Sequence, residues 1–425
     1  GVDPAPGAAT IHGGTASRRP ALGTPMTFYV ICALLFVFSA TFCWAAGPLC
    51  ARLARRWGVV DHPGERKIHA TAVPYGGGIA ILMAVGVTVA IAYLTLALGF
   101  DALPAAWREF IRPHLSGLTE AATIGKLAGM LGGAVGVFVL GLVDDFRPLP
   151  PRLKLLAQVL AASAAWLGGV RVLPLFDSQL LSYFLTVGWV VVVTNAFNLL
   201  DNMDGLSAGV ALAACGALFG VMSGEYYFTA AMISVFAGAL AGFLPRNFAR
   251  PEKKMFMGDA GALFAGFVLA TLTIAGNYYA DRGPTHALLM PVILLGVPLF
   301  DTVSVIVIRL RLGRPVMVGD TNHLSHRLTR RGFTRHQAVG IIWLLSVICG
   351  LLAQLLAQLD TTRAIITFAA ALSVVLLMAA LMLSPAPQGT PPLQNAPDAT
   401  PPAPASGAAP NCGANGDAPL SPPRA

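Results

Sequence analysis

The chain has 425 residues, of which 56% are hydrophobic and only 11% are charged. A soluble domain carries about 25% charged residues, so this chain has too little polar surface to cover a globule in water. Its net charge of +8 does not indicate nucleic acid as a partner, because a polytopic membrane protein gathers basic residues on one side of the bilayer. Composition therefore predicts an all-α polytopic membrane protein with the lipid bilayer as a partner, and the long apolar runs exclude an outer-membrane barrel.

Eleven apolar runs with few or no charges come close to the roughly 20 residues that a helix needs to cross a bilayer. They predict transmembrane helices over residues 27–49, 75–100, 127–143, 155–170, 178–200, 205–224, 226–245, 260–280, 284–308, 337–359 and 364–384. We expect residues 1–25 to be a disordered N-terminal extension, native or foreign to the protein. Residues 26–384 then form one transmembrane domain, and the Pro/Ala-rich residues 385–425 form a disordered tail.

The distribution of basic residues predicts the orientation of these helices. The loops that follow odd-numbered runs contain 19 of the 28 Lys and Arg residues, and the loops that follow even-numbered runs contain 6. Because cytoplasmic loops carry the excess of Lys and Arg, the odd-numbered loops are assigned to the cytoplasm. The N-terminus is then outside the membrane and the C-terminus is cytoplasmic.

The positions of the carboxylates indicate where chemistry takes place. Seven of the 20 Asp and Glu residues lie at or near the predicted cytoplasmic ends of the runs, namely Asp144, Asp145, Asp201, Asp204, Asp259, Asp301 and Asp320. Carboxylates are costly beside a low-dielectric slab, and several at one level repel one another unless a cation lies among them. Mg²⁺, a hard cation with oxygen ligands, is the best candidate. The active site is therefore expected at the cytoplasmic face, with salt-bridged loops as the alternative.

Basic side chains in the same loops favour one type of chemistry. Carboxylates that hold a metal, together with cations that neutralise phosphoryl oxygens, are typical of phosphoryl transfer. The segment that ends the third run carries Asp144 and Asp145, and Lys154 follows in the next run. Adjacent carboxylates at a helix end can bracket one site, so that one holds a cation while the other handles a proton.

A richer polar pattern ends the fifth run. Asn195, Asn198, Asp201 and Asp204 recur every three residues between apolar neighbours. This spacing places them along a drifting stripe of one helix face. A transmembrane helix that only faces lipid does not carry polar groups at this spacing, so the stripe predicts a ligand site.

Two further segments complete the set of candidates. The segment Phe256–Gly261 contains two glycines that allow a backbone to approach a ligand while Asp259 points at it, and Asp259 can also be the N-cap of the next helix. His323 and His326 resemble a metal-binding pair, but zinc would need a third soft ligand that the segment lacks. Phosphate contact is favoured for these histidines, with exposed surface histidines as the alternative.

Five ordered motifs give the chain a family resemblance. They are RKIHATAVPYGGG (66–78), GLVDD…KLLAQ (141–158), NAFNLLDNMDGL (195–206), FMGDAG (256–261) and PLFDTVSVIVIR…DTNHLSHRL (298–328). From about Met26 to residue 340 the sequence resembles the polyprenyl-phosphate N-acetylhexosamine-1-phosphate transferases, which include bacterial GlcNAc-1-phosphate transferases and the phospho-MurNAc-pentapeptide translocases. It departs from the family pattern at Asn202, Ala262 and Ser325, where Gly, Ser and His are common.

The resemblance implies a role for each candidate residue. It implies Asp259 and Asp201 as metal ligands and Asp144, Asp145, Asp201, Asp204 and His323 as catalytic residues. It also implies substrate binding by Lys67, Lys154, Asn195, Asn198, Asn247, Phe256 and His326, with Phe256 stacked on uracil.

The resemblance also implies an activity and a location. We expect transfer of a sugar-1-phosphate, with N-acetylglucosamine as the default sugar, from a UDP-N-acetylhexosamine to undecaprenyl phosphate with release of UMP, to initiate a cell-envelope glycan. The expected cofactor is Mg²⁺, for which Mn²⁺ can substitute. The expected location is the bacterial cytoplasmic (inner) membrane, with a homodimer as one assembly. The alternatives are a phospho-MurNAc-pentapeptide transferase, an ion-coupled transporter and an inactive membrane scaffold.

Overall fold

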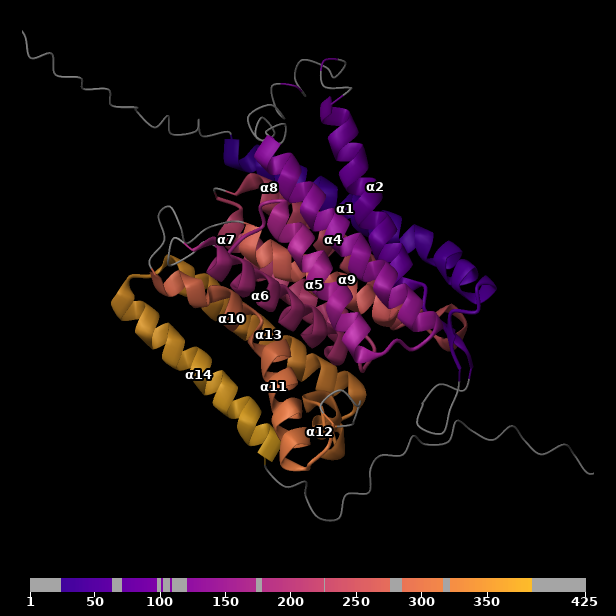
Figure 1. Ribbon diagram of the computed structural model, residues 1–425, viewed down its shortest axis with the longest axis vertical. Coiled ribbons are helices and arrows are strands. Elements are labelled where there is room, and N and C mark those ends of the chain that lie inside the picture. The colour runs from indigo at the N-terminus through magenta and orange to yellow at the C-terminus, as the bar shows by residue number, and fades with distance from the viewer. Residues whose placement is uncertain are drawn as a thin grey trace, which may run out of the picture.

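The computed structural model describes residues 24–62, 71–97, 101, 108, 121–172, 178–224, 226–275, 285–315 and 322–383 (Figure 1). The predictions for Lys67, for Asp320, for almost all of the 1–25 extension and for the 385–425 tail lie outside these residues.

The described chain is a bundle of helices. The helices are α1 (Thr24–Arg56), α2 (Gly77–Ala97), α4 (Ala121–Phe146), α5 (Pro151–Leu167), α6 (Gln179–Leu200), α7 (Leu206–Met222), α8 (Tyr227–Asn247), α9 (Gly258–Ala275), α10 (Met290–Leu294), α11 (Gly296–Arg311), α12 (Leu324–Arg330), α13 (Arg335–Gln358) and α14 (Thr361–Leu383). The described residues also contain two 3-10 turns, η2 (Pro251–Lys253) and η3 (Thr285–Leu289), and an antiparallel pair of two-residue strands, β1 (Val60–Asp61) and β2 (Val73–Pro74).

Each predicted apolar run coincides with a helix or with a pair of helices. In the described part of the chain, eight helices are long and apolar enough to cross a membrane, and the number is up to nine if each bent pair counts as one span. The prediction of an all-α polytopic protein is therefore confirmed. The α5 and α7 helices have 17 residues each, so the number of eleven spans and their orientation stay predictions.

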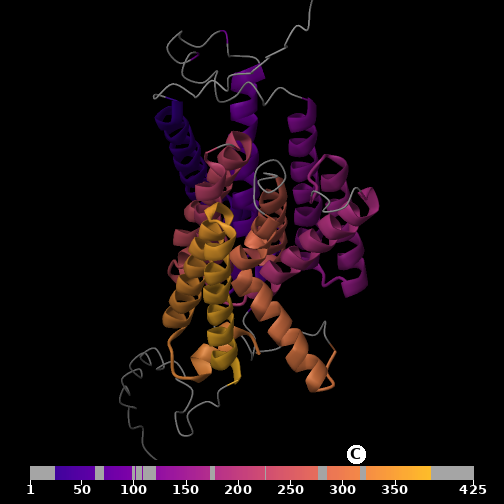
Figure 2. The same cartoon turned by 90° about the vertical axis from the view of Figure 1, so that its left-hand side faces the viewer.

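The run 284–308 is not one straight helix. The segments His286–Leu294 and Gly296–Arg311 meet at an angle of 71°. Pro298 lies in the first turn of α11, where its missing N–H and fixed φ favour the start of a helix rather than the continuation of one. In Figure 2 the orange α11 leans away from the axis of the bundle.

The core of the bundle is α9. Every residue of α9 except Asp259 is buried, and the helix packs against α2, α4, α6, α7 and α8. Small residues allow this close packing, since a Cβ at Gly266 would lie 2.8 Å from the Cα of Thr194 on α6. The outer helices α1 and α14 instead expose large apolar side chains such as Trp44 and Ile366, as expected of surfaces that face lipid. Asp259 therefore stands at the end of the most deeply buried helix.

Candidate active site

The start of α9 is held by a carboxylate from α4. The Asp145 side chain accepts hydrogen bonds from the backbone N–H groups of Asp259 (2.8 Å) and Ala260 (3.1 Å). Gly258 has φ +72°, and a Cβ there would lie 2.6 Å from the Asp145 carboxylate. The prediction that Asp259 is itself the N-cap is wrong, because Asp259 lies in the first turn of α9 and Asp145 supplies the cap.

Close backbone contact fixes this junction. A Cβ at Gly141 on α4 would lie 2.5 Å from the Cα of Ala260, so the residue must be glycine for α4 and α9 to meet here. The glycines that begin α2 serve the same purpose. The backbone N–H of Gly77 donates to the carbonyl of Phe256 (2.9 Å) and that of Gly78 donates to the carbonyl of Met257 (3.0 Å), and a Cβ at Gly78 would lie 2.8 Å from the Cα of Gly261. The PYGGG and FMGDAG motifs are therefore paired by their backbones.

A lysine links two of the predicted carboxylates. The Lys154 ammonium, at the start of α5, forms a salt bridge with Asp144 and lies 3.4 Å from the Asp259 carboxylate. Asp144 also accepts a hydrogen bond from the backbone N–H of Leu149 (2.7 Å). The structure thus brings together Asp144, Asp145, Lys154 and Asp259, as the sequence predicted.

The polar stripe on α6 reaches the same place. Asn195 exchanges side-chain hydrogen bonds with Gln158 of α5. The amide nitrogen of Asn198 is buried, and the Asn198 side chain lies beside the Asp259 carboxylate. The polar stripe therefore ends next to Asp259.

Asp201 and Asp204 follow α6 in a short loop. Burial raises the pKa of the Asp201 carboxyl to about 8, and the nearby charges of Asp259, Asp145 and Asp204 raise it further in the same direction. The Lys254 ammonium forms a salt bridge of 2.6 Å with Asp204 and lies 5.3 Å from the centre of the Phe256 ring. A carboxylate, an ammonium group and an aromatic face therefore adjoin one another at the edge of the acidic cluster.

The histidine segment is organised by a carboxylate that was not selected as a site residue from the sequence. Asp301 on α11 accepts from Nδ1 of His323 (2.7 Å) and from the backbone N–H of Leu324 (2.7 Å), and both Asp301 and His323 are buried. Asp301 is one of the seven carboxylates near the predicted cytoplasmic ends of the runs, and this position was the sequence signal that could have marked it as a site residue. Burial, then the charges of His323 and Arg330, hold the pKa of His326 below its ordinary value.

The described hydrogen bonds of the Asn247 side chain go to backbone groups and not to the acidic side chains. Its side-chain oxygen accepts from the backbone N–H of Gly205 (2.5 Å), and its amide nitrogen donates to the carbonyl of Met255 (3.0 Å). The residue is buried, and these bonds hold the start of α7 to the segment before α9. Substrate binding by Asn247 stays a prediction, while the observed contacts give the residue a role in shaping the loops.

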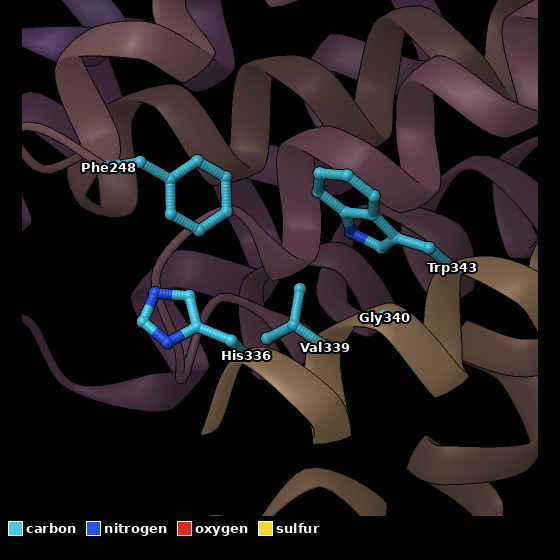
Figure 3. A pocket seen from close by; sticks show the side chains of 5 residues that line it. All are labelled: Phe248, His336, Val339, Gly340 and Trp343. Carbon is cyan, nitrogen blue, oxygen red and sulfur yellow. The ribbon is translucent and has the colours of Figure 1, made fainter. Parts of the chain in front are cut away.

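A pocket opens beside the loop that carries Asp204. It has a volume of about 360 Å³ and is lined by Phe248, His336, Val339, Gly340 and Trp343. Figure 3 shows the Phe248 and Trp343 rings on either side of it and the His336 ring below Phe248. Nε1 of Trp343 donates to the carbonyl of Gly205 (3.1 Å), so the wall of the pocket is tied to the residue that follows Asp204. None of the predicted site residues lines this pocket.

Carboxylates and ammonium groups from separate segments of a helical bundle therefore form one charged site. The family profile described as "Glycosyl transferase family 4" matches residues 127–277, which include Asp144, Asp145, Asp201, Asp204 and Asp259. The chain belongs to this family, together with the polyprenyl-phosphate N-acetylglucosamine-1-phosphate transferases.

Three relatives illustrate the match. The chain is 32% identical over 311 residues to a probable undecaprenyl-phosphate N-acetylglucosaminyl 1-phosphate transferase of Bacillus subtilis, covering 71% of this chain and 78% of the relative. It is 36% identical over 332 residues to the decaprenyl-phosphate N-acetylglucosaminephosphotransferase of Mycobacterium tuberculosis, covering 71% and 76%. It is 27% identical over 331 residues to the undecaprenyl-phosphate alpha-N-acetylglucosaminyl 1-phosphate transferase of Escherichia coli, covering 73% and 78%.

Proposed function

We propose that the protein transfers N-acetylglucosamine-1-phosphate from UDP-N-acetylglucosamine to undecaprenyl phosphate, with release of UMP, in the bacterial inner membrane. The observation that carries the proposal is the meeting of Asp259, Lys154 and Asp145 from three separate segments at one end of the bundle. The names of the relatives supply the transferred N-acetylglucosamine-1-phosphate and the polyprenyl phosphate, while the UDP-sugar as the donor, with UMP as its leaving group, is part of the proposal. A transporter would instead place such carboxylates near the middle of the membrane.

The carboxylates of the site fit a Mg²⁺ ion that is bound by few protein ligands. Among the described residues, no group of three or more His, Cys, Asp and Glu side chains is arranged to hold a metal ion. Mg²⁺ in phosphoryl-transfer sites is commonly bound by only one or two carboxylates, with water and substrate phosphates at its other positions. Asp259 and Asp201 would supply those carboxylates, since their charges already interact. The buried amide nitrogen of Asn198 would instead donate to a phosphate oxygen. When bound, the ion would neutralise charge on the donor diphosphate.

The residues around this pair divide the remaining tasks. Phe256, with Lys254 over its ring, offers a face on which uracil can stack and a cation for the diphosphate. Lys154, between Asp144 and Asp259, would bind the phosphate of the lipid and so bring its oxygen towards the sugar-bearing phosphorus. Asp145 keeps Asp259 in place by capping α9. The substrate roles of Asn195, Asn198, His323 and His326 remain part of the proposal.

The chemistry requires little acid–base catalysis. The second pKa of a phosphate monoester is about 6, so the lipid phosphate is largely ionised at neutral pH and is already a nucleophile. Its oxygen attacks the phosphorus that bears the sugar, and the bond from that phosphorus to UMP breaks. The protein then accelerates the reaction by orienting two anions and by neutralising the charge that develops between them. Asp144, which is paired with Lys154, has a positioning task in this scheme.

The activity is tested with the purified full-length protein in detergent micelles. UDP-N-acetylglucosamine, undecaprenyl phosphate and Mg²⁺ are added, and both released UMP and the lipid diphosphate product are measured. We expect UMP and lipid product in equal amounts and no UMP when the lipid is omitted. A panel of other UDP-sugars, including UDP-MurNAc-pentapeptide, tests the choice of donor. Release of no UMP from any donor would contradict the proposal.

Binding of Mg²⁺ is expected to depend on pH through Asp201. Because the pKa of Asp201 is raised to about 8, its carboxyl is largely protonated at pH 7, and a cation must displace that proton. The affinity for Mg²⁺ should therefore rise about tenfold per pH unit below pH 8 and level off above it. Calorimetric titration in two buffers of different ionisation enthalpy measures the affinity and the released proton. Asp201→Asn should abolish the pH dependence between pH 7 and 8, whereas a steep dependence retained there in this variant would exclude Asp201 as its source.

A further inference from the structure

The short helix α12 follows His323 and carries His326, and side-chain contacts with separate parts of the chain hold it in place. Asp301 of α11 holds its first turn through His323 and the backbone of Leu324. In the middle of α12, Arg327 donates to the carbonyl of Met382, near the end of α14. A helix of seven residues is not stable alone, so these contacts determine where its histidines lie.

A third contact joins α12 to the acidic loop. The hydroxyl of Ser325 donates to the side-chain oxygen of Asn202 (2.6 Å), and the Asn202 amide nitrogen donates to the carbonyl of Leu199 (3.1 Å). Ser325 is 1% exposed, so this hydroxyl has no access to bulk water as a substitute partner. Asn202 thus bridges the last turn of α6 and α12, and it does so between Asp201 and Asp204.

We propose that the Ser325–Asn202 hydrogen bond is a positioning contact that sets the place of His323 and His326 relative to Asp201 and Asp204. The inference rests on the proposed function. Two observations support it beyond the distance. The bond joins α12 to the loop after α6 that carries both carboxylates, and its partners lie 123 residues apart in the sequence. The Ser325 side chain is buried, so the Asn202 oxygen is not readily replaced by bulk water.

Steady-state kinetics with Ser325→Ala, Asn202→Ala and the double variant test the coupling. Because a small misplacement of a reacting group lowers the chemical rate more than binding, we expect kcat to fall about tenfold in each single variant. The KM for the UDP-sugar should change by less than about twofold, and the double variant should lose no more than either single one. Multiplicative losses in the double variant, or an unchanged kcat in Ser325→Ala, would overturn the proposal.

Ser346→Ala is the matched control. Ser346 is 2% exposed, and its hydroxyl donates to the carbonyl of Ile342 within α13, so the substitution removes a buried hydroxyl away from the acidic loop. Its kcat should equal that of the unmodified protein. An equal loss of kcat in Ser346→Ala and Ser325→Ala would overturn the positioning role, because it would reduce the effect to the loss of a buried hydroxyl.

A cross-linking arm separates failure of this inference from failure of the proposed function. In the double variant Asn202→Cys with Ser325→Cys, an oxidant should form a disulfide that protects both thiols from a maleimide label, and a reductant should reverse it. No protection would overturn the contact itself, whatever the activity. Protection in a protein that releases no UMP with any donor would overturn the proposed function, and the positioning role with it, while leaving the contact established.

Discussion

Asp259→Asn should lower the rate of UMP release by at least about a thousandfold while the protein still inserts and folds. The carboxylate lies within 3.4 Å of the Lys154 ammonium, beside Asn198, and at the end of a helix that is otherwise wholly buried. An amide of the same shape keeps the packing but removes the charge that a cation and the transition state require. Loss of one electrostatic contact of this kind typically costs about 10²–10³ in rate, and loss of the proposed Mg²⁺ ligand would add to it.

Activity is measured as UMP release from the purified variant, and folding is measured by elution as a single species from a gel-filtration column in detergent. Asp360→Asn is the control, because Asp360 is exposed and lies between α13 and α14, outside the site. The control should keep full activity. An Asp259→Asn protein with activity within about tenfold of the unmodified protein would remove Asp259 from the reaction.

Gly258→Ala should disrupt the site through geometry alone. A side chain at φ +72° costs roughly 1–2 kcal/mol, and the new Cβ would lie 2.6 Å from the Asp145 carboxylate that caps α9. Asp145 must therefore move, and the N–H groups of Asp259 and Ala260 lose their acceptor. We expect a lower melting temperature and a fall in UMP release of about a hundredfold, since a displacement of about 1 Å at a reacting group can cost that much.

Gly58→Ala separates the two causes. Gly58 has φ +74°, nearly the same as Gly258, but a Cβ there would meet nothing within 4 Å. Gly58→Ala therefore has the same backbone strain as Gly258→Ala, but its new Cβ does not collide with another atom. Thermal unfolding followed by tryptophan fluorescence, together with UMP release, compares the variants. Equal losses in the two variants would show that backbone strain, and not displacement of Asp145, explains the effect.

The sequence alone predicted the class of fold and the meeting of Asp144, Asp145, Lys154 and Asp259. Long apolar runs and rare carboxylates are strong signals in a membrane protein. The sequence could not show that Asp145 caps α9, since a cap from another helix requires the tertiary contact of α4 with α9. It could not select Asp301, because the contact with His323 spans 22 residues, from α11 to the residue before α12. Nor could it show that Asn202 and Ser325 are bonded.

The burial of α9 has a consequence for how the enzyme can evolve. A helix enclosed by five others cannot shift to suit a different substrate, and cores tolerate few changes in volume. New donor sugars or longer lipids must then be accommodated by replacing residues in the surrounding loops and outer helices. The central helix α9 thus constrains the fold, while the surrounding loops and outer helices can vary. Laboratory selection for altered substrates should therefore accumulate its successful substitutions outside Gly258–Ala275.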